Sequence, residues 1–424
     1  MLDPQRVTLS PWAPEDRALL DRANTRAMTA QLGGPEPADA VERRHEDYLR
    51  LSREGTAQMF RVDVDDAAAG GVGFWEVEHE GVPAYETGWY TLPEFQGRGV
   101  ATAALRHVVA LVRERGDRDL LVAYPWRENA ASTALCRSAG FEHHGSSRAP
   151  WRGREVTFEN WVLDMRPLDL AGREPDVDER FAGDDLDASR WWPYYTPHWS
   201  SRAQSAARYG LTDAGLELRI DEHTPPWAPE WDGHVRCSHL QTGQHSGPVG
   251  SGTGQHRFRD GLVVREQQPE HRGWLPRYGV IEVRMAAVRH PDAMVAFWPI
   301  GFEDRPDDCG EICIAEIFGS EIDDAGGWVG VGVKPQNDPR LRADFEKVRV
   351  SGDLTSMHDY AVEWSPDRLR FFVDGRWVKT VAQRIDYPVQ LMLDLYELPG
   401  AGPRDVAALP HRFRAERVRT FPPR

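Results

Sequence analysis

The spacing of hydrophobic residues changes character along the chain. Up to about residue 165, stretches of helical spacing alternate with short runs of strand spacing. After residue 181 the pattern becomes short alternating runs separated by Gly, Pro and Asp, which is typical of a β-sandwich. The first part therefore predicts an α/β fold, and the second an all-β sandwich.

The first part predicts three helices and three strands. The helices are expected over 16–29, 38–53 and 102–115. The strands are expected over 57–63, 72–78 and 84–91, with the first two meeting at an Ala-Ala-Ala-Gly-Gly turn, and the family resemblance given below implies a further strand over 120–124. In the second part, strands are expected over 216–220, 234–240, 279–286, 294–300, 311–318, 328–333, 358–364, 368–373 and 389–395. Asp374-Gly375, before a further run over 377–381, predicts a hairpin.

Residues 166–180 separate the two patterns. This stretch is polar and acidic, carries two prolines and has no sustained apolar period, so it is expected to be a linker. The predicted organisation is a domain over 1–166, a linker over 167–180 and a domain over 181–424. In a chain of 424 residues, each domain is long enough to bury its own core.

Composition narrows the range of partners. A formal net charge of −16 disfavours binding of the whole protein to nucleic acid or to an anionic membrane. Four scattered cysteines and five loop histidines show no metal-ligand spacing, so we expect reduced thiols and no metal site. The first residues lack an apolar leader and no later run could span a bilayer, so a cytoplasmic location is expected.

A glycine-containing turn precedes the helix expected over 102–115. The segment Pro93-Glu-Phe-Gln-Gly-Arg-Gly-Val-Ala101 would bring free backbone N–H groups and the positive end of a helix dipole to one point. Gly97 and Gly99 would let the backbone approach a phosphate closely. The pattern favours a pyrophosphate site, and the alternative is an ordinary loop.

The neighbouring residues resemble the GNAT acetyltransferases. Gln96 to Ala101 is similar to the family's acetyl-CoA loop, and Asn129-Ala-Ala-Ser-Thr-Ala-Leu-Cys-Arg-Ser-Ala-Gly-Phe141 resembles its next helix. The resemblance spans residues 5–166 and implies acetyl-CoA as acyl donor and a protein N-terminus or small amine as acceptor. It also implies a cofactor-binding set of Gln96, Gly97, Arg98, Gly99, Val100, Ala101 and Asn129.

Acetyl transfer to an ammonium needs a base, and departure of a thiolate is helped by an acid. Glu86, on the strand before the turn, is the expected base, and the alternative is a solvated strand carboxylate. Many relatives carry a tyrosine at the position of Cys136, so Ser132 or Cys136 is the candidate acid, unless coenzyme A leaves unaided.

Two carboxylates stand out in the second part, on the expected strand 311–318. Glu311 and Cys313 share one face of this strand, and Glu316 joins that face only if one residue near Ala315 bulges from the ladder. On a concave sheet two such glutamates can approach the separation of about 5–5.5 Å that a retaining glycosidase uses.

This part resembles the family 16 glycoside hydrolases, which have a curved jelly-roll fold related to concanavalin A. Similar segments are Tyr278 to Met285, Ala296-Phe-Trp-Pro299 and His358 to Gly375. The resemblance implies that Glu311 is the nucleophile and Glu316 the general acid and then base. Cys313 replaces the family's aspartate, and its thiol should hold and tune Glu311 less well.

Aromatic residues favour a carbohydrate partner, because sugars stack on aromatic faces. Trp298 is the expected sugar platform, while Trp364 and Trp377 are expected in the core. The prediction is therefore a bifunctional protein, an N-acetyltransferase fused to a retaining β-glycosidase-like domain, acting on a glycan or a glycosylated small molecule. The alternative is an acetyltransferase with an impaired, carbohydrate-binding sandwich, for which Cys313 would mark the loss of catalysis.

Overall fold

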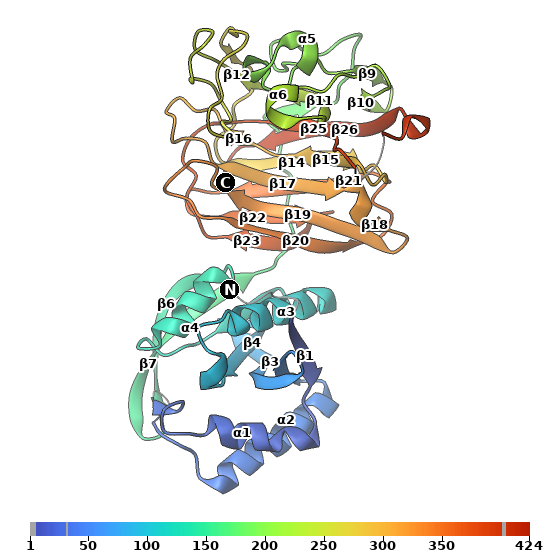
Figure 1. Cartoon of the computed structure of the whole chain (residues 1–424). Helices are drawn as coiled ribbons and strands as arrows, with labels where there is room; N and C mark the ends of the chain where they lie inside the picture. Colours follow the sequence, from blue (N-terminus) through green and yellow to red (C-terminus); the bar gives the residue numbers. More distant parts are fainter. Residues whose placement is uncertain (1–5, 31–32, 401–403) are drawn as a thin grey trace. The chain divides into compact units, whose positions relative to one another are not determined.

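The computed structural model describes residues 6–30, 33–400 and 404–424, and the chain divides into two compact units, Met1–Arg166 and Pro167–Arg424 (Figure 1). The first unit mixes helices and strands, and the second is built almost wholly of strands. Among the described residues, no helix combines the length and the apolar character needed to cross a bilayer.

The first unit folds around one seven-stranded sheet, with strand order β1-β2-β3-β4-β5-β7-β6. Its elements are β1 (Val7–Pro11), α1 (Arg17–Ala23), α2 (Ala38–Glu54), β2 (Ala57–Val64), β3 (Ala67–His79), β4 (Val82–Thr91), α3 (Val100–Arg115), β5 (Leu120–Ala123), α4 (Ala130–Ser138), β6 (Glu142–Trp151) and β7 (Arg154–Asp164). Neighbouring strands are antiparallel except β4 and β5, which are parallel. Helix α3 lies against β1, β3 and β4 through the predicted apolar stripe, including Leu105, Val108 and Val112.

Two local predictions for this unit were wrong. Helix α1 ends at Ala23, because the amide side chain of Asn24 bonds both the backbone N–H and the C=O of Glu36 and so turns the chain away. The turn between β2 and β3 lies at Asp65-Asp66, where both residues have positive φ. The Ala-Ala-Ala-Gly-Gly stretch instead belongs to β3, where Gly70 and Gly71 pack closely against Tyr90 of β4.

The second unit is a sandwich of two sheets. The first has the order β23-β22-β21-β14-β26-β10-β9 with β8 on β26, and the second has β11-β25-β15-β17-β16-β24 with β19, β20 and β18 continuing from β17. The strands used below are β8 (Val177–Glu179), β11 (Arg236–Gln241), β14 (Gly279–Ala286), β15 (Ala293–Phe297), β16 (Ile300–Gly301), β17 (Glu311–Phe318), β19 (Gly326–Lys334), β20 (Asp344–Ser351), β24 (Val389–Gln390), β25 (Met392–Glu397) and β26 (His411–Phe421). The remaining elements are β9 (Tyr209–Thr212), β10 (Gly215–Ile220), β12 (Gly243–Gln244), β13 (His271–Arg272), β18 (Ile322–Asp323), β21 (His358–Trp364), β22 (Leu369–Val373) and β23 (Arg376–Val381), with short helices α5 (Arg202–Ser205) and α6 (Pro229–Asp232).

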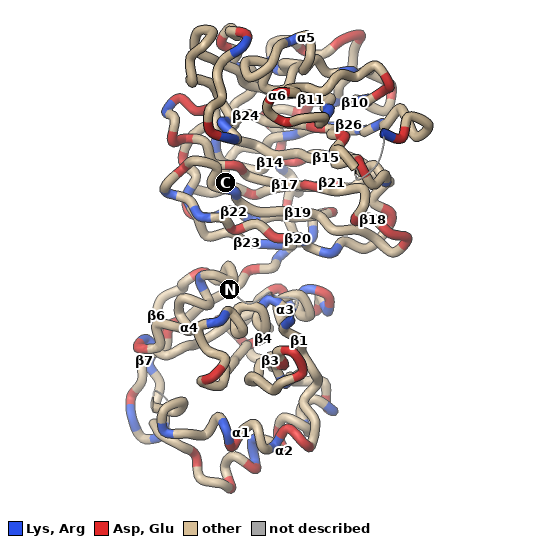
Figure 2. The backbone as a smooth tube through the Cα atoms, viewed as in Figure 1, with Lys and Arg blue, Asp and Glu red and all other residues tan. Residues whose placement is uncertain are grey.

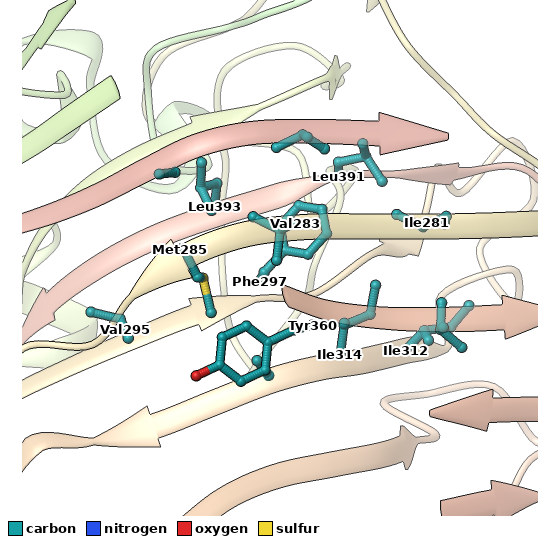
Figure 3. Close-up of a cluster of buried hydrophobic side chains, with 14 of the residues drawn as sticks. Ile281, Val283, Met285, Val295, Phe297, Ile312, Ile314, Tyr360, Leu391 and Leu393 are labelled. Carbon is teal, nitrogen blue, oxygen red and sulfur yellow. The ribbon is translucent and has the colours of Figure 1, made fainter. Parts of the chain in front are cut away.

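The core lies between the two sheets. Ile281, Val283 and Met285 of β14 face Ile312 and Ile314 of β17 (Figure 3). Trp364 is in this core, and Trp377 is also buried, as expected. Acidic and basic positions are interspersed along the backbone of this unit (Figure 2).

The structure departs from the predicted second part in several places. The stretch expected as one strand over 294–300 divides into β15 and β16, and 389–395 divides into β24 and β25. Strands β20 and β26 were not predicted, although residues 411–415 of β26 alternate between buried and exposed side chains. Within the segment expected as a linker, Val177–Glu179 forms β8 and pairs with Val418–Thr420 of β26.

Candidate functional site

The first candidate site lies where β4 separates from β5. These parallel strands pair only through Tyr85–Leu121 and Glu86–Val122 within their described length. The chain then passes through the predicted turn into α3, whose N-cap is Gly99. Gly97 and Gly99 have φ of 70° and 87°, and no atom lies within 4 Å of where a Cβ would project. The turn thus exposes its backbone as an anion site requires.

The side chains of the turn have different roles. Gln96 donates from Nε2 to the carbonyl of Thr91 at 2.8 Å and closes the turn. The Arg98 guanidinium lies over the Phe95 ring, 5.6 Å from its centroid. Val100 is buried, so only its backbone N–H is open to a ligand, and Ala101 follows it in the first turn of α3.

Asn129 caps the neighbouring helix α4, and its side-chain oxygen accepts a hydrogen bond from the Ser132 backbone N–H at 3.1 Å. The cap uses only the oxygen of the Asn129 side chain, so its two amide N–H groups are left to donate to a bound ligand. Cys136 is fully buried, and burial raises the pKa of its thiol to about 12. Such a thiol is a poor proton donor near neutral pH.

Glu86 lies on β4 opposite Trp75, whose indole N–H donates to the Glu86 carboxylate at 3.2 Å. Burial raises the pKa of Glu86, and the indole hydrogen bond partly opposes that shift. A carboxylate with a raised pKa accepts a proton more readily near neutral pH than an exposed one, as a general base requires.

Tyr124 and His79, in the same part of the sheet as Glu86, were not predicted as site residues. The hydroxyl of Tyr124, just after β5, lies 2.8 Å from Nδ1 of His79 at the end of β3. Burial raises the pKa of Tyr124 to about 12, and the charges of Glu86 and Glu80 contribute to the shift. The position of Tyr124 at the end of an expected strand was visible in the sequence, but its contact with His79 depends on the fold.

The second candidate site is built on β17. Against β19, Cys313 pairs with Gly332 and Glu316 with Gly330, so β17 carries one extra residue between them. Ile312, Ile314, Ala315 and Ile317 point into the core. Glu311, Cys313 and Glu316 therefore share the outer face, and the predicted bulge is confirmed.

Lys334 joins the two glutamates. It lies opposite Glu311 on β19, and its Nζ is 3.1 Å from Glu311 Oε1 and 2.8 Å from Glu316 Oε2. The two contacted oxygens are therefore at most about 6 Å apart. Gln336 donates to the other oxygen of Glu311 at 2.5 Å.

Burial affects the pKa values of Glu311, Lys334 and Cys313. Burial raises the pKa of Glu311, and the Lys334 ammonium and the Gln336 hydrogen bond oppose that shift. The same two carboxylates raise the pKa of Lys334 against the effect of burial. Cys313 is 1% exposed, its thiol donates to the Gly330 carbonyl at 3.5 Å, and burial raises its pKa.

Trp298 follows β15 on the same side of the sheet. It is buried, and its indole N–H donates to Asp394, whose other carboxylate oxygen contacts Nδ1 of His239. The ring of His256 lies 5.2 Å from that of Trp298. Neither Asp394 nor the two histidines were predicted as site residues. No group of three His, Cys, Asp or Glu suited to a metal occurs in the described part of the chain.

Each of the two compact units contains a match to one known protein family. Residues 6–142 match the family model of the acetyltransferase (GNAT) domain, and residues 275–396 match that of glycosyl hydrolases family 16. No curated protein matches the chain in sequence.

Three solved structures illustrate the similarity. The GlcNAcα1-4Gal releasing endo-β-galactosidase from Clostridium perfringens is 27% identical with a TM-score of 0.53, covering 61% of this chain and 65% of that enzyme. A laminarinase from Flavobacterium sp. UMI-01 is 17% identical with a TM-score of 0.43, covering 59% of this chain and 100% of that one. The acetyl transferase that modifies the N-terminal serine of 50S ribosomal subunit protein L7/L12 from Salmonella typhimurium is 19% identical with a TM-score of 0.34, covering 38% of this chain and 95% of that one.

The chain thus spans about two thirds of the length of the endo-β-galactosidase. The first unit has the GNAT α/β fold and the second the family 16 jelly-roll sandwich, as predicted. The chain therefore joins a GNAT acetyltransferase domain to a glycosyl hydrolase family 16 domain, and both are families of enzymes.

Proposed function

We propose that the chain is a bifunctional enzyme in which an acetyl-CoA-dependent N-acetyltransferase is fused to a retaining β-glycosidase. The transferase domain is proposed to extend over 1–166 and the glycosidase domain over 181–424, to which the segment 167–180 adds strand β8. One observation supports the glycosidase best: Glu311 and Glu316 lie on one face of a bulged strand, joined through Lys334.

In the proposed glycosidase reaction, Glu311 attacks the anomeric carbon and Glu316 protonates the departing oxygen. Glu316 then takes a proton from the water that hydrolyses the glycosyl ester on Glu311. Lys334 and Gln336 hold the Glu311 carboxylate in position, and Trp298 offers a ring for sugar stacking. The endo-β-galactosidase is 27% identical to this chain, so a β-linked glycan is the first substrate to test.

In the proposed acetyl transfer, the turn from Gln96 to Ala101 and the amide of Asn129 hold the pyrophosphate and pantetheine arm. Glu86 takes a proton from the acceptor ammonium, directly or through water. Tyr124 is the proposed proton donor to the departing thiolate, because its hydroxyl is hydrogen-bonded to His79, whereas Cys136 is fully buried. Acetyl-CoA chemistry and free cysteines fit a cytoplasmic location.

Two assays test the proposal. Turnover of aryl β-glycosides or of laminari- and cello-oligosaccharides, lost in Glu311→Gln, supports the hydrolase. Release of coenzyme A with peptide N-termini or amino sugars, lost in Glu86→Gln, supports the transferase. Absence of both activities with every substrate would contradict the proposed function.

Cys313 favours a second candidate, in which the sandwich binds a glycan without cleaving it. A buried thiol cannot replace a carboxyl group that holds the nucleophile. Tight glycan binding that is unchanged in Glu311→Gln, without turnover, would select this candidate. We propose that one glycosylated amine serves both domains, which calorimetry on the full chain with an amino-sugar oligosaccharide tests.

A further inference from the structure

Trp328 on β19 has the most exposed aromatic ring of the second unit. It is 44% exposed, whereas every other Trp, Tyr or Phe described in this unit is buried or half-buried. Because Val329 and Val331 point into the core, Trp328 lies on the outer face of β19. Strand β19 pairs with β17, whose outer face carries Glu311 and Glu316. The exposed ring and the two glutamates therefore share one face of the sheet.

Trp328 lies beyond the proposed acid, on the side away from the proposed nucleophile. Lys334 of β19 pairs with Glu311 and Gly330 pairs with Glu316, and Trp328 is two residues farther along β19. Trp328 and Glu316 are thus diagonal neighbours on adjacent strands, with Cα atoms about 7–8 Å apart. The order along the two strands is therefore nucleophile, acid, ring.

The neighbouring rings on this face are less open than Trp328. Strands β17, β19 and β20 run side by side, and Phe318 of β17 and Phe345 of β20 are both half-buried (Figure 1). The Nζ of Lys347 lies 4.7 Å from the centroid of the Phe318 ring and covers part of it. The guanidinium carbon of Arg349 is farther from the Trp328 centroid, at 5.9 Å. The Trp328 ring is therefore the aromatic surface on this face that a ligand reaches most easily.

Arg349 and Asp323 give the ring a polar border. Arg349 pairs with Trp328 across β19 and β20, and its Nη2 donates to the two oxygens of Asp323 at 2.6 and 2.7 Å. The side chains of Arg349 and Asp323 are 32% and 59% exposed, so both can also contact a ligand. A sugar places its C–H face on an aromatic ring, and its hydroxyls donate and accept hydrogen bonds. An exposed ring bordered by a donor and an acceptor suits one sugar residue.

The charges beside the ring are balanced. Arg349 pairs with Asp323, and Lys347, on the same strand β20, pairs with Glu321. Each of these two cations has a carboxylate partner, so the local charge does not favour a sulfated or uronate-containing glycan. The sugar that this surface suits best is therefore neutral.

We propose that Trp328, with Arg349 and Asp323, binds the leaving group of the glycosidase reaction, and that this leaving group is a neutral sugar. The anomeric carbon forms its bond to Glu311 while its bond to the departing oxygen breaks, and the proton of Glu316 passes to that oxygen. Because the ring follows the acid along the strands, the departing sugar extends from Glu316 toward Trp328. This inference rests on the proposed hydrolase and adds what holds its leaving group.

The test compares two substrates that transfer the same sugar to Glu311 and differ in the leaving group. One is a laminari- or cello-oligosaccharide, from which a sugar departs, and the other is the matching β-glycosyl fluoride, from which a fluoride ion departs. In the full chain, Trp328→Ala should lower kcat/KM for the oligosaccharide about tenfold, because the departing sugar loses its stacking surface. It should leave kcat/KM for the fluoride unchanged, because no sugar then occupies the leaving-group side. An equal loss for both substrates, or no loss for either, would overturn the proposal.

Further variants serve as controls. Trp328→Phe keeps an aromatic ring and should retain most of the activity toward the oligosaccharide. Trp151→Ala removes the exposed tryptophan of the first unit and should change neither constant. Arg349→Met should lower kcat/KM for the oligosaccharide only, by a smaller factor, because the ring remains. If Trp328→Ala changes the mass of the protein in light scattering and neither constant, the ring contacts a second copy of the chain and the proposal is overturned.

If neither substrate is cleaved, the proposed hydrolase fails, and the sugar site at Trp328 is tested separately by binding. Calorimetry on the full chain should then show that Trp328→Ala weakens binding of a neutral oligosaccharide about tenfold, while Trp151→Ala does not. Equal affinities of wild type and Trp328→Ala, tighter binding of a sulfated oligosaccharide, or no binding of either sugar would overturn the proposal.

Discussion

The ammonium of Lys334 lies 2.8 Å from a carboxylate oxygen of Glu316, and the same nitrogen is 3.1 Å from Glu311. One cation thus balances two carboxylates in a partly buried site, which reduces the electrostatic cost of bringing them together. The contact occupies one of the two carboxylate oxygens of Glu316, so that oxygen is available to carry a proton only if Lys334 moves from it.

Lys334→Met should lower kcat/KM for glycosides on the order of 10²-fold, because Glu311 loses a charged hydrogen-bond donor. Since Lys334 lowers the pKa of Glu311, its removal should shift the acid limb of the pH–rate profile to higher pH. Lys347→Met is the matched control, because Lys347 lies on the same face and pairs with Glu321 instead. An unchanged acid limb in Lys334→Met would contradict this role.

Cys313→Asp should raise glycosidase turnover on the order of tenfold. The new carboxyl group would lie between the glutamates, where Lys334 can pair with it and leave Glu316 free to carry a proton. Cys313→Asn introduces a side chain of similar size without the charge and should give no gain. A gain with both variants would point to packing, and no gain with aspartate would mean that Lys334 and Gln336 already hold Glu311.

The sequence predicted local features better than contacts between distant segments. The strand over 311–318 and its bulge follow from the alternation of glutamate and isoleucine within a few residues. The contact of Lys334 with both glutamates depends on the register of β17 and β19, and that of Tyr124 with His79 on the pairing of the first sheet. The packing of Trp199 and Trp227 against Met392 of β25 was not predictable either, because it joins residues that are far apart in the sequence.

Gly99→Ala should weaken binding of acetyl-CoA about tenfold, because its Cβ would project where the phosphates approach. Gly116→Ala is the control, since Gly116 ends the same helix with φ of 61°. Both changes place alanine at positive φ and should lower the free energy of unfolding by about 1–2 kcal/mol. Equal loss of acetyl-CoA affinity in the two variants, measured by calorimetry, would argue against the turn as the cofactor site.

Glu86→Gln should lower kcat for acetyl transfer on the order of 10²–10³-fold with little change in KM for acetyl-CoA. Because burial raises the pKa of Glu86, the wild-type acid limb should lie above the ordinary range for a glutamate, and the variant should lose it. Glu78→Gln is the control, since Glu78 is exposed on the neighbouring strand β3. An identical pH profile in wild type and Glu86→Gln would exclude Glu86 as the base.

The segment 195–264 should become less stable in acid because of His198, which is buried within it. This histidine is fully buried: one ring nitrogen contacts the Gln255 carbonyl at 2.9 Å and the other the Gln244 amide nitrogen at 3.2 Å. Burial, with a smaller effect of the charges of His245 and His256, lowers the pKa of His198 to about 3. If both ring nitrogens of His198 carried a proton, the N–H at Nδ1 would point at the side-chain N–H of Gln244, which cannot accept a hydrogen bond.

A depressed folded-state pKa means that the unfolded chain binds the proton first, starting near pH 6.5. The stability contributed by neutral His198 is therefore complete above pH 6.5 and falls with pH toward about 3, by up to about 1.4 kcal/mol per pH unit. Hydrogen exchange of peptides from 195–264 should accelerate as pH falls from 6.5 to 4, after correction for intrinsic rates. His198→Gln, which cannot titrate, should flatten this dependence, and an unchanged slope would show that His198 does not govern it.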